Sequence, residues 1–261
     1  MSITQNEKAQ AFAALHRGPT FVIPNPWDIA SARALADFGF VALATSSGAS
    51  GWALGRREGE LTRDETLAHA RSIVAATDLP VSVDLEKGFG DASAVVAETI
   101  LLAANTGVVG GSIEDATGVR ARPLFDIGHA TERVAAAAEA ARSLPFTFTL
   151  TARAENFRCG HSDLDDTIRR LQAFEAAGAD VLFAPGLPDL NAVRAVCASV
   201  GKPVNFMAGL KGRSFTVAEL GSAGVRRISL GSALYRAAMT SFISATKEIR
   251  ENGTFGFVDR F

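Results

Sequence analysis

One pattern constrains the fold of this chain more than any other: a short apolar segment is followed by a helical stretch, and the unit occurs eight times. The apolar segments are nearly continuous runs of Val, Ile, Leu and Phe, which is typical of strands buried on both faces of a parallel sheet. They cover residues 20–25, 40–46, 80–86, 108–115, 146–152, 180–185, 203–208 and 226–231. Eight units in 261 residues, with no linker between them, predict one (β/α)8 barrel of the TIM type over residues 1–261. A doubly wound open sheet is the alternative.

The segments between the predicted strands carry helix signals. Gly39 is a predicted helix stop, and Thr62 followed by Glu65 is a capping-box pattern at a helix start. Further helix starts are predicted at Asp91, Asp126, Asp163 and Thr216. The spacing is irregular only at residues 45–60, where a long loop is expected after the second strand.

Composition narrows the class of protein. The chain is 48% hydrophobic and 21% charged, with a net charge of −2, which gives no reason to expect a nucleic acid or an anionic membrane as partner. The two cysteines, Cys159 and Cys197, do not form a disulfide framework or a metal-ligand pair. The N-terminus lacks the layout of a signal peptide, and no apolar run reaches the length of a membrane span. We therefore expect a cytoplasmic protein.

Carboxylates gather where the predicted strands end, which is where barrel active sites lie. Asp84 and Glu86 end the third strand, two residues apart on one face, and Glu114 ends the fourth. With no Lys or Arg between neighbouring strand ends, these charges would raise one another's pKa, and a divalent cation would relieve the repulsion. Oxygen ligands favour Mg²⁺, with Mn²⁺ as the alternative, and Mg²⁺ commonly keeps several bound waters. The competing interpretation is that acidic residues after strands, such as Asp91 and Asp115, only cap the next helix.

Other strand ends supply polar groups for a ligand. Asn25 follows the first strand, Ser47 and Gly48 follow the second, and Arg153 and Glu155 follow the fifth. The Arg153 guanidinium is suited to a substrate carboxylate. Lysine and Ser-His-Asp chemistry are not predicted, because the lysines and histidines fall outside the predicted strands.

At these residues the chain resembles the isocitrate lyase/phosphoenolpyruvate mutase superfamily. The matching pieces are PNPWDIASARAL, TSSGAS, VDLEKGFGD, GSIEDA, RPLFDI and TARAENF, in that order, between residues 24 and 157. The family cleaves or forms a C–C or P–C bond beside an α-oxo acid unit with Mg²⁺, through an enolpyruvate-like intermediate.

The resemblance implies roles for individual residues. Glu58, Asp84, Glu86 and Glu114 would hold the metal and its water shell, with Asp84 as the direct ligand. Ser47 and the backbone amides of Gly48 and Ala49 would form the oxyanion cradle for the oxo-acid end of the substrate. Arg153 would bind the substrate carboxylate, and Glu155 would orient Arg153. From its position after the first strand, Asn25 is also expected to line the site.

The chain departs from the better-known members at three points. Glu58 and Glu86 stand where aspartates are usual, so the geometry around a metal should differ. The K-K-C-G-H signature of isocitrate lyase is missing, which argues against that activity. The gating loop is short: only ATGVRA (116–121) precedes RPLFDI, and Arg120 or Arg122 is either its cationic group or a solvated loop residue.

Three hypotheses follow. The favoured one is an Mg²⁺-dependent lyase or decarboxylase that cleaves a C–C bond of a small oxo- or hydroxy-dicarboxylate. The second is a phosphonate-processing enzyme, a phosphoenolpyruvate mutase or phosphonopyruvate hydrolase. The third is a barrel that binds an oxo acid without turnover. A shortened loop shields a reactive phosphoryl group poorly, which favours the first.

The C-terminal region, about residues 232–261, is predicted as an additional helical segment with an aromatic end. It either covers its own barrel or, as the resemblance implies, exchanges between subunits of a homotetramer. A homo-oligomer, tetramer or dimer, is therefore expected.

Overall fold

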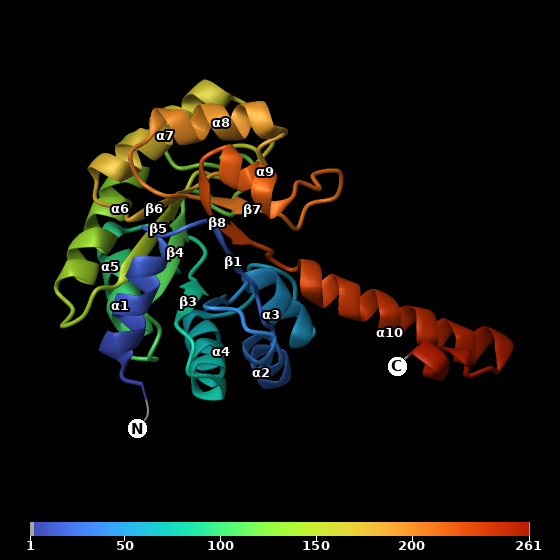
Figure 1. Ribbon diagram of the computed structural model, residues 1–261. Coiled ribbons are helices and arrows are strands. Elements are labelled where there is room, and N and C mark those ends of the chain that lie inside the picture. Colours follow the sequence, from blue (N-terminus) through green and yellow to red (C-terminus); the bar gives the residue numbers. More distant parts are fainter. Residues whose placement is uncertain (1–2, 261) are drawn as a thin grey trace.

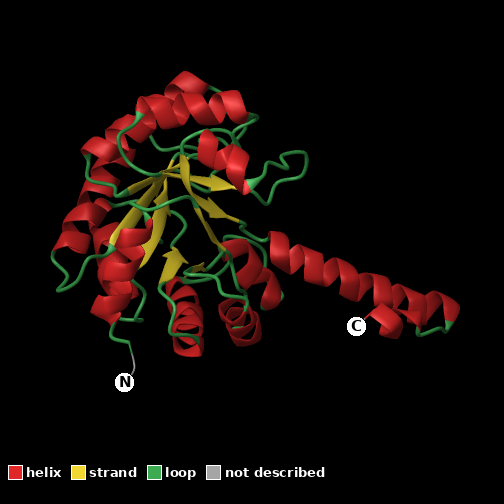
Figure 2. Cartoon of the chain, in the orientation of Figure 1, coloured by secondary structure: helices red, strands yellow, loops and turns green. Residues whose placement is uncertain are grey.

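The protein is described by a computed structural model that covers residues 3–260. Eight parallel strands form one sheet in the order β1-β8-β7-β6-β5-β4-β3-β2. Their bounds are β1 Phe21–Ile23, β2 Leu43–Ala44, β3 Val81–Asp84, β4 Gly110–Glu114, β5 Thr149–Arg153, β6 Val181–Phe183, β7 Val204–Met207 and β8 Val225–Ser229. All eight predicted strands are present, and helices surround them (Figure 2).

The pairing of β1 with β8 turns the sheet into a barrel. Phe21 lies opposite Arg227 in that pair, and the strands run parallel. Between β1 and β2 the backbone contact is a hydrogen bond from Ala44 N to Pro24 O, 3.0 Å long. The barrel is thus nearly closed, which confirms the (β/α)8 prediction and excludes the open sheet.

The helices begin largely where the sequence predicts. They are α1 Gln5–Leu15, α2 Ile29–Asp37, α3 Ser47–Ala53, α4 Arg63–Ala76, α5 Ser93–Ala104, α6 Ile127–Arg142, α7 Leu164–Ala176, α8 Leu190–Ser199, α9 Val217–Ser222 and α10 Ala233–Asn252, followed by a short 3₁₀ helix, Gly256–Arg260. The side chains of Thr62, Asp126, Asp163 and Thr216 each accept a backbone N–H at a helix start, as predicted.

Two local predictions are wrong. Asp91 does not cap α5, which follows Ala92 without a side-chain cap; Asp91 instead pairs with Lys87 at 2.8 Å. The expected loop at 45–60 contains α3, whose N-cap is Ser46. Ser, Gly and Ala dominate this helix, so it lacks the apolar periodicity by which helices are recognised in sequence.

The hydrophobic core lies mainly between the sheet and its helices. At the amino ends of the strands, Phe12 of α1 packs with Phe21, Ala42 and Val109 in a second cluster, so α1 closes that end of the barrel. The carboxyl ends remain open to ligands.

The last long helix, α10, projects away from the barrel (Figure 1). None of its residues is buried, so it does not cover its own barrel. Its first turns touch the body through Tyr235, whose ring lies 5.6 Å from that of Trp27. Within residues 3–260, no helix combines the length and apolar character required to cross a bilayer.

Candidate active site

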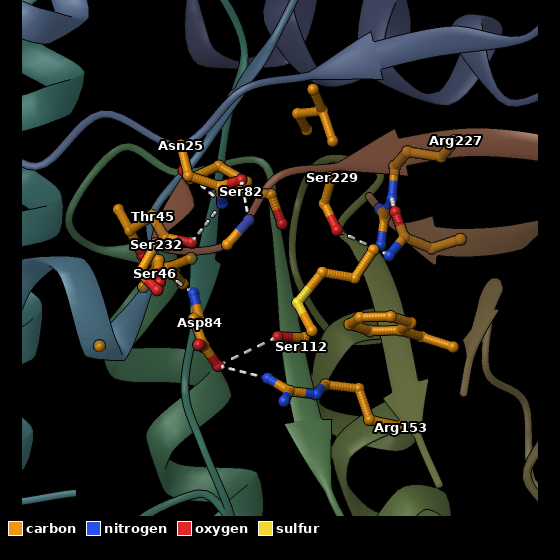
Figure 3. Close-up of a pocket in the computed structure, with 18 of the residues that line it drawn as sticks. Asn25, Thr45, Ser46, Ser82, Asp84, Ser112, Arg153, Arg227, Ser229 and Ser232 are labelled. Carbon is orange, nitrogen blue, oxygen red and sulfur yellow. Dashed lines mark hydrogen bonds and ion pairs between the residues drawn. The ribbon is translucent and has the colours of Figure 1, made fainter. Parts of the chain in front are cut away.

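Two adjoining cavities open at the carboxyl ends of the strands. The inner one, about 90 Å³, reaches into the barrel and is lined by residues of most strands, including Asp84 and Arg153 (Figure 3). The outer one, about 550 Å³, is lined by Glu86, Glu114 and the loop after β4. Glu58 and Arg158 line both cavities, so the two form one site.

Asp84, the last residue of β3, lies at the centre of this site. One carboxylate oxygen accepts hydrogen bonds from the backbone and hydroxyl of Ser47, at 3.1 and 3.0 Å. The other accepts from Arg153 Nη1 at 3.0 Å and from the amide of Glu86 at 3.2 Å. Burial would raise the pKa of Asp84, but Arg153 and these donors hold it below the ordinary value, so the carboxylate is ionised.

Arg153, at the end of β5, occupies the space between the carboxylates. Its guanidinium contacts Asp84 Oδ1 at 3.0 Å, Glu114 Oε2 at 3.0 Å and Glu155 Oε1 at 2.8 Å. The prediction that no arginine separates the strand ends is therefore wrong, because Arg153 reaches across β4 to β3. Strand spacing alone does not reveal the reach of so long a side chain.

Glu86 does not share a strand face with Asp84, contrary to the prediction, because β3 ends at Asp84. Its backbone has φ 50°, a left-handed conformation that is uncommon for a residue other than glycine. This turn directs Glu86 to the outer cavity, where its Oε1 is buried without a hydrogen-bond partner. Burial, Asp84 and Glu58 raise the pKa of Glu86 to about 7.

Glu58 approaches the site from the segment after α3. A Cβ on Gly48 would lie 3.4 Å from its Cδ, and Arg158 Nη2 lies 3.6 Å from its Oε1. Its side chain is half exposed. The segment 45–60 also brings Glu58 near enough to Glu86 for its charge to help raise the pKa of Glu86.

Glu114 and Glu155 complete the acidic cluster around Arg153. Burial raises the pKa of Glu114 well above its ordinary value; Arg153 opposes this shift, while Glu155, Asp84 and Glu86 add to it. Because the carboxylates outnumber the guanidinium groups in this cluster, one of the carboxylates readily keeps a proton. Glu155 is 4% exposed and accepts from Arg153 Nε at 2.9 Å, the contact expected of a residue that orients this arginine.

The predicted oxyanion cradle lies at the start of α3, beside Asp84. The amide of Ala49 already bonds to Ser46 Oγ as part of the helix cap, at 3.4 Å. Ser47 and Gly48 are buried, Gly48 lines the inner cavity and Ser47 the outer one.

Asn25 lines the inner cavity, but its hydrogen-bonding groups serve the fold. Its amide donates to Ala44 O and Thr45 O, and its carbonyl accepts from the amides of Leu230 and Gly231. Asn25 thereby ties β8 to β2 across the gap in the barrel.

Several residues of the site were missed by the sequence analysis. They are Ser112 and Arg158, which lie beside Asp84 and Glu58, and Asn205, Arg227 and Ser229, which line the inner cavity from β7 and β8. A signal was available for the last three, because each is a polar residue inside or at the end of an apolar run. Arg120 lines neither cavity of the site, and Arg122 faces a separate one beside Asn156.

The donor set fits a hard divalent cation held largely through water. In residues 3–260 no three His, Cys, Asp or Glu side chains lie in an arrangement that would ligate an ion directly. The unpartnered Glu86 Oε1 and the excess of carboxylates nevertheless favour a cation beside Asp84, with the other carboxylates on its waters.

The chain is similar to known proteins over most of its length. The sequence matches the family described as phosphoenolpyruvate phosphomutase over residues 12–250. A candidate lyase/mutase from Burkholderia cenocepacia J2315 is 53% identical, with a TM-score of 0.96 over 98% of this chain and 92% of that one. An oxaloacetate decarboxylase of Ectopseudomonas mendocina is 30% identical over 231 residues, which are 86% of this chain and 78% of that protein.

A more distant structure shares the fold. Phosphonopyruvate hydrolase, solved with oxalate and Mg²⁺, is 22% identical, with a TM-score of 0.86 over 96% of this chain and 88% of that one. Because the family match and the nearer relatives span most of the sequence, the chain belongs to the phosphoenolpyruvate phosphomutase family, within the isocitrate lyase/phosphoenolpyruvate mutase superfamily.

Proposed function

We propose that the protein is an Mg²⁺-dependent lyase or decarboxylase that cleaves a C–C bond beside an α-oxo acid unit. The observation that carries this proposal is the arrangement of Asp84, Glu86 and Glu114 around one side of Arg153, with Ser47 on the other side of Asp84. The oxaloacetate decarboxylase among the relatives supports C–C chemistry. That the enzyme is cytoplasmic and takes small acids as ligands remains part of this proposal.

Each group has a role in this reaction. When bound, Mg²⁺ would stabilise negative charge on the oxo-acid oxygen, and Mn²⁺ would substitute for it. Asp84, Glu86, Glu114 and Glu58 would hold the ion and its waters. Ser47 and the Gly48 amide would donate to the same end of the substrate. Arg153, oriented by Glu155, would bind the carboxylate of the oxo-acid unit. From an oxo acid that loses carbon dioxide, the bonding electrons would stay on the oxo-acid unit as an enolate, which a proton from solvent then converts to the product. From a 2-hydroxy acid, loss of the hydroxyl proton would leave the oxo acid as the carbonyl product, and the bonding electrons would go to the other fragment, which takes up a proton.

The loop after β4 favours C–C cleavage over phosphonate chemistry. It folds back on itself through an antiparallel bridge between Ala116 and Leu124 and a hydrogen bond from Thr117 N to Pro123 O. Thr117, Gly118 and Val119 line the outer cavity. A tight turn of this size shields a reactive phosphoryl group from water poorly.

A substrate panel tests the proposal. Purified protein with Mg²⁺ should release an oxo acid from at least one small oxo- or hydroxy-dicarboxylate, and EDTA should abolish this. Release of phosphate, or migration of the ³¹P signal, with phosphonopyruvate would instead favour a hydrolase or mutase. Tight oxo-acid binding with no product and no metal dependence would support a barrel without turnover.

A further inference from the structure

The inner cavity ends on a buried arginine that contacts no carboxylate among the described residues. Arg227, in β8, is 5% exposed and points into the barrel, where Figure 3 shows it beside Ser229. Its Nε donates to Asn205 Oδ1 at 2.9 Å, its Nη2 to Thr151 Oγ1 at 3.0 Å, and its Nη1 lies 3.3 Å from His16 Nε2. None of these partners is an acid.

His16 does not supply a negative charge either. Its Nδ1 lies 2.8 Å from Phe12 O, so this nitrogen carries the proton and Nε2 accepts from Arg227. Burial, followed by the charge of Arg227, lowers the pKa of His16 to about 3. The imidazole is therefore neutral at ordinary pH.

The other arginines that are largely enclosed in the described residues have acidic groups near them. Arg153 and Arg170 each form ion pairs with carboxylates, and Arg133 lies in the field of Asp91, Asp115 and Glu114. For Arg227 burial alone lowers the pKa, to about 9, with no acidic group opposing it. Burying a guanidinium costs much free energy unless an anion accompanies it.

Space for an anion exists above Arg227. Bulky branched side chains usually fill the interior of such a barrel. Here Ile23, Phe183 and Met207 also line the cavity, but Ser82, Ser112, Asn205 and Ser229 line the rest of it, and these smaller polar groups leave space that reaches Arg227. Ser229 Oγ accepts from Asn205 Nδ2 at 3.0 Å, so its own hydroxyl proton can turn to a ligand.

The distance from the proposed reaction centre suits one small ligand. Thr151, which bonds Arg227, and Arg153 are two residues apart on one face of β5, roughly 7 Å along the strand. The two guanidinium groups thus occupy successive layers of the same cavity. Its volume of about 90 Å³ restricts the ligand to a short chain.

We infer that Arg227, with Asn205 and Ser229, forms a second anion subsite that takes the far carboxylate of a short dicarboxylate substrate. The inference rests on the proposed function, because it places the oxo-acid end of the substrate at Ser47 and Arg153. It assigns the second anionic end of the expected dicarboxylate to named residues of the inner cavity. The far carboxylate of the ligand would supply the negative charge that Arg227 does not receive from its neutral protein partners.

Malate and lactate form a matched pair of probes, because they share a hydroxy-acid end and differ in the far carboxylate. In calorimetric titrations with Mg²⁺, the wild-type protein should bind malate about tenfold tighter than lactate or better. Arg227→Gln should weaken malate binding by about the same factor and leave lactate within roughly twofold. Arg226→Gln, an adjacent arginine that donates to Gly18 O outside the cavity, is the control.

A second variant distinguishes loss of the subsite from loss of folded protein. Asn205→Asp keeps the size of the side chain and supplies Arg227 with a permanent counter-charge. It should therefore abolish the preference for malate while raising the melting temperature of the unliganded protein.

Equal affinity of the wild type for both acids, or an equal loss of both in Arg227→Gln, would overturn the subsite and leave the proposed function standing. If oxalate also fails to bind with Mg²⁺, the proposed function fails, and the subsite with it.

Discussion

At the scale of single residues, Glu86 is the most unusual member of the site. It combines a left-handed backbone, a buried oxygen without a partner and a pKa raised to about 7. Such strain persists only where the surrounding structure enforces it, and it gathers at functional sites. The unsatisfied carboxylate is what a cation with its water shell would satisfy.

The pH dependence of stability should reveal this residue. Because its folded pKa of about 7 exceeds the ordinary 4.5, the folded state binds the proton more tightly than the unfolded state. The resulting stability is complete below pH 4.5 and is lost as the pH rises through about 7. In EDTA, the free energy of unfolding of Glu86→Gln should thus equal that of the wild type in acid. At pH 8 it should exceed the wild-type value by about 2 kcal/mol, after allowance for the partial exposure of Glu86.

Unfolding curves at several pH values, with and without Mg²⁺, measure this effect. Mg²⁺ should stabilise the wild type more than Glu86→Gln, because the variant keeps Asp84 but loses one of the carboxylates that would bind the ion's waters. The exposed Glu139 of α6 provides the control, since Glu139→Gln should follow the wild type. A parallel pH profile for Glu86→Gln and the wild type would contradict the assigned environment.

The sequence predicted which residues gather here better than how they interact. Asp84, Glu114, Arg153 and Glu155 lie together because each ends or follows a strand, and strand ends can be found from periodicity. The ion pairs from Arg153 to Asp84 and Glu114 could not be predicted, since they depend on side-chain reach across strands. The turn at Glu86 was also hidden, because a left-handed glutamate has no sequence signal.

At the scale of elements, a buried ion pair links β4, β5 and α7. Asp115, just after β4, is 2% exposed and accepts from the Glu155 amide at 2.8 Å. Arg170 of α7 contacts the other oxygen of Asp115 at 3.0 Å and Asp166 at 2.8 Å. Through Glu155 this link positions Arg153. The suggestion that Asp115 caps a helix is therefore wrong: α6 is capped by Asp126.

Removing one partner of this ion pair should destabilise the fold more than removing both charges. Arg170→Met leaves the Asp115 carboxylate buried without its cation, so we expect a loss of about 3 kcal/mol at neutral pH. Adding Asp115→Asn removes the stranded charge and should recover part of that loss. Arg169→Met, at an exposed arginine of the same helix that also contacts Asp166, should cost little.

A double-mutant cycle in chemical denaturation gives the coupling between Asp115 and Arg170. Additive losses, with no recovery in the double variant, would show that the pair does not act as a unit. Element positions themselves were predictable from capping and periodicity. The failure at α3 arose because a short helix of small residues resembles a loop in sequence.

At the scale of the whole molecule, α10 is a long helix that projects from the barrel and buries none of its residues. Twenty residues span roughly 30 Å, and Phe242 and Ile243 are 61% and 49% exposed. The interpretation that it covers its own barrel is excluded by its position. The remaining expectation is that it exchanges with a second copy, in a tetramer or a dimer; the sequence could not decide this, because an amphipathic helix has the same pattern against either surface.

Light scattering tests this expectation. The wild type should have a mass that is a multiple of 27.3 kDa, and Phe242→Glu should lower it, because a charge would be buried in the contact. Ser244→Glu, an exposed polar position of the same helix, should keep the wild-type mass. A wild-type mass near 27.3 kDa would rule out the exchange.

The whole account depends on a divalent ion among the carboxylates, with an oxo acid beside it. A crystal soaked with Mn²⁺ and oxalate, with anomalous scattering recorded for the metal, examines this directly. We expect one metal peak next to Asp84, waters between it and Glu58, Glu86 or Glu114, and oxalate facing Ser47. A site without a metal peak, or oxalate bound there without a metal, would contradict the account.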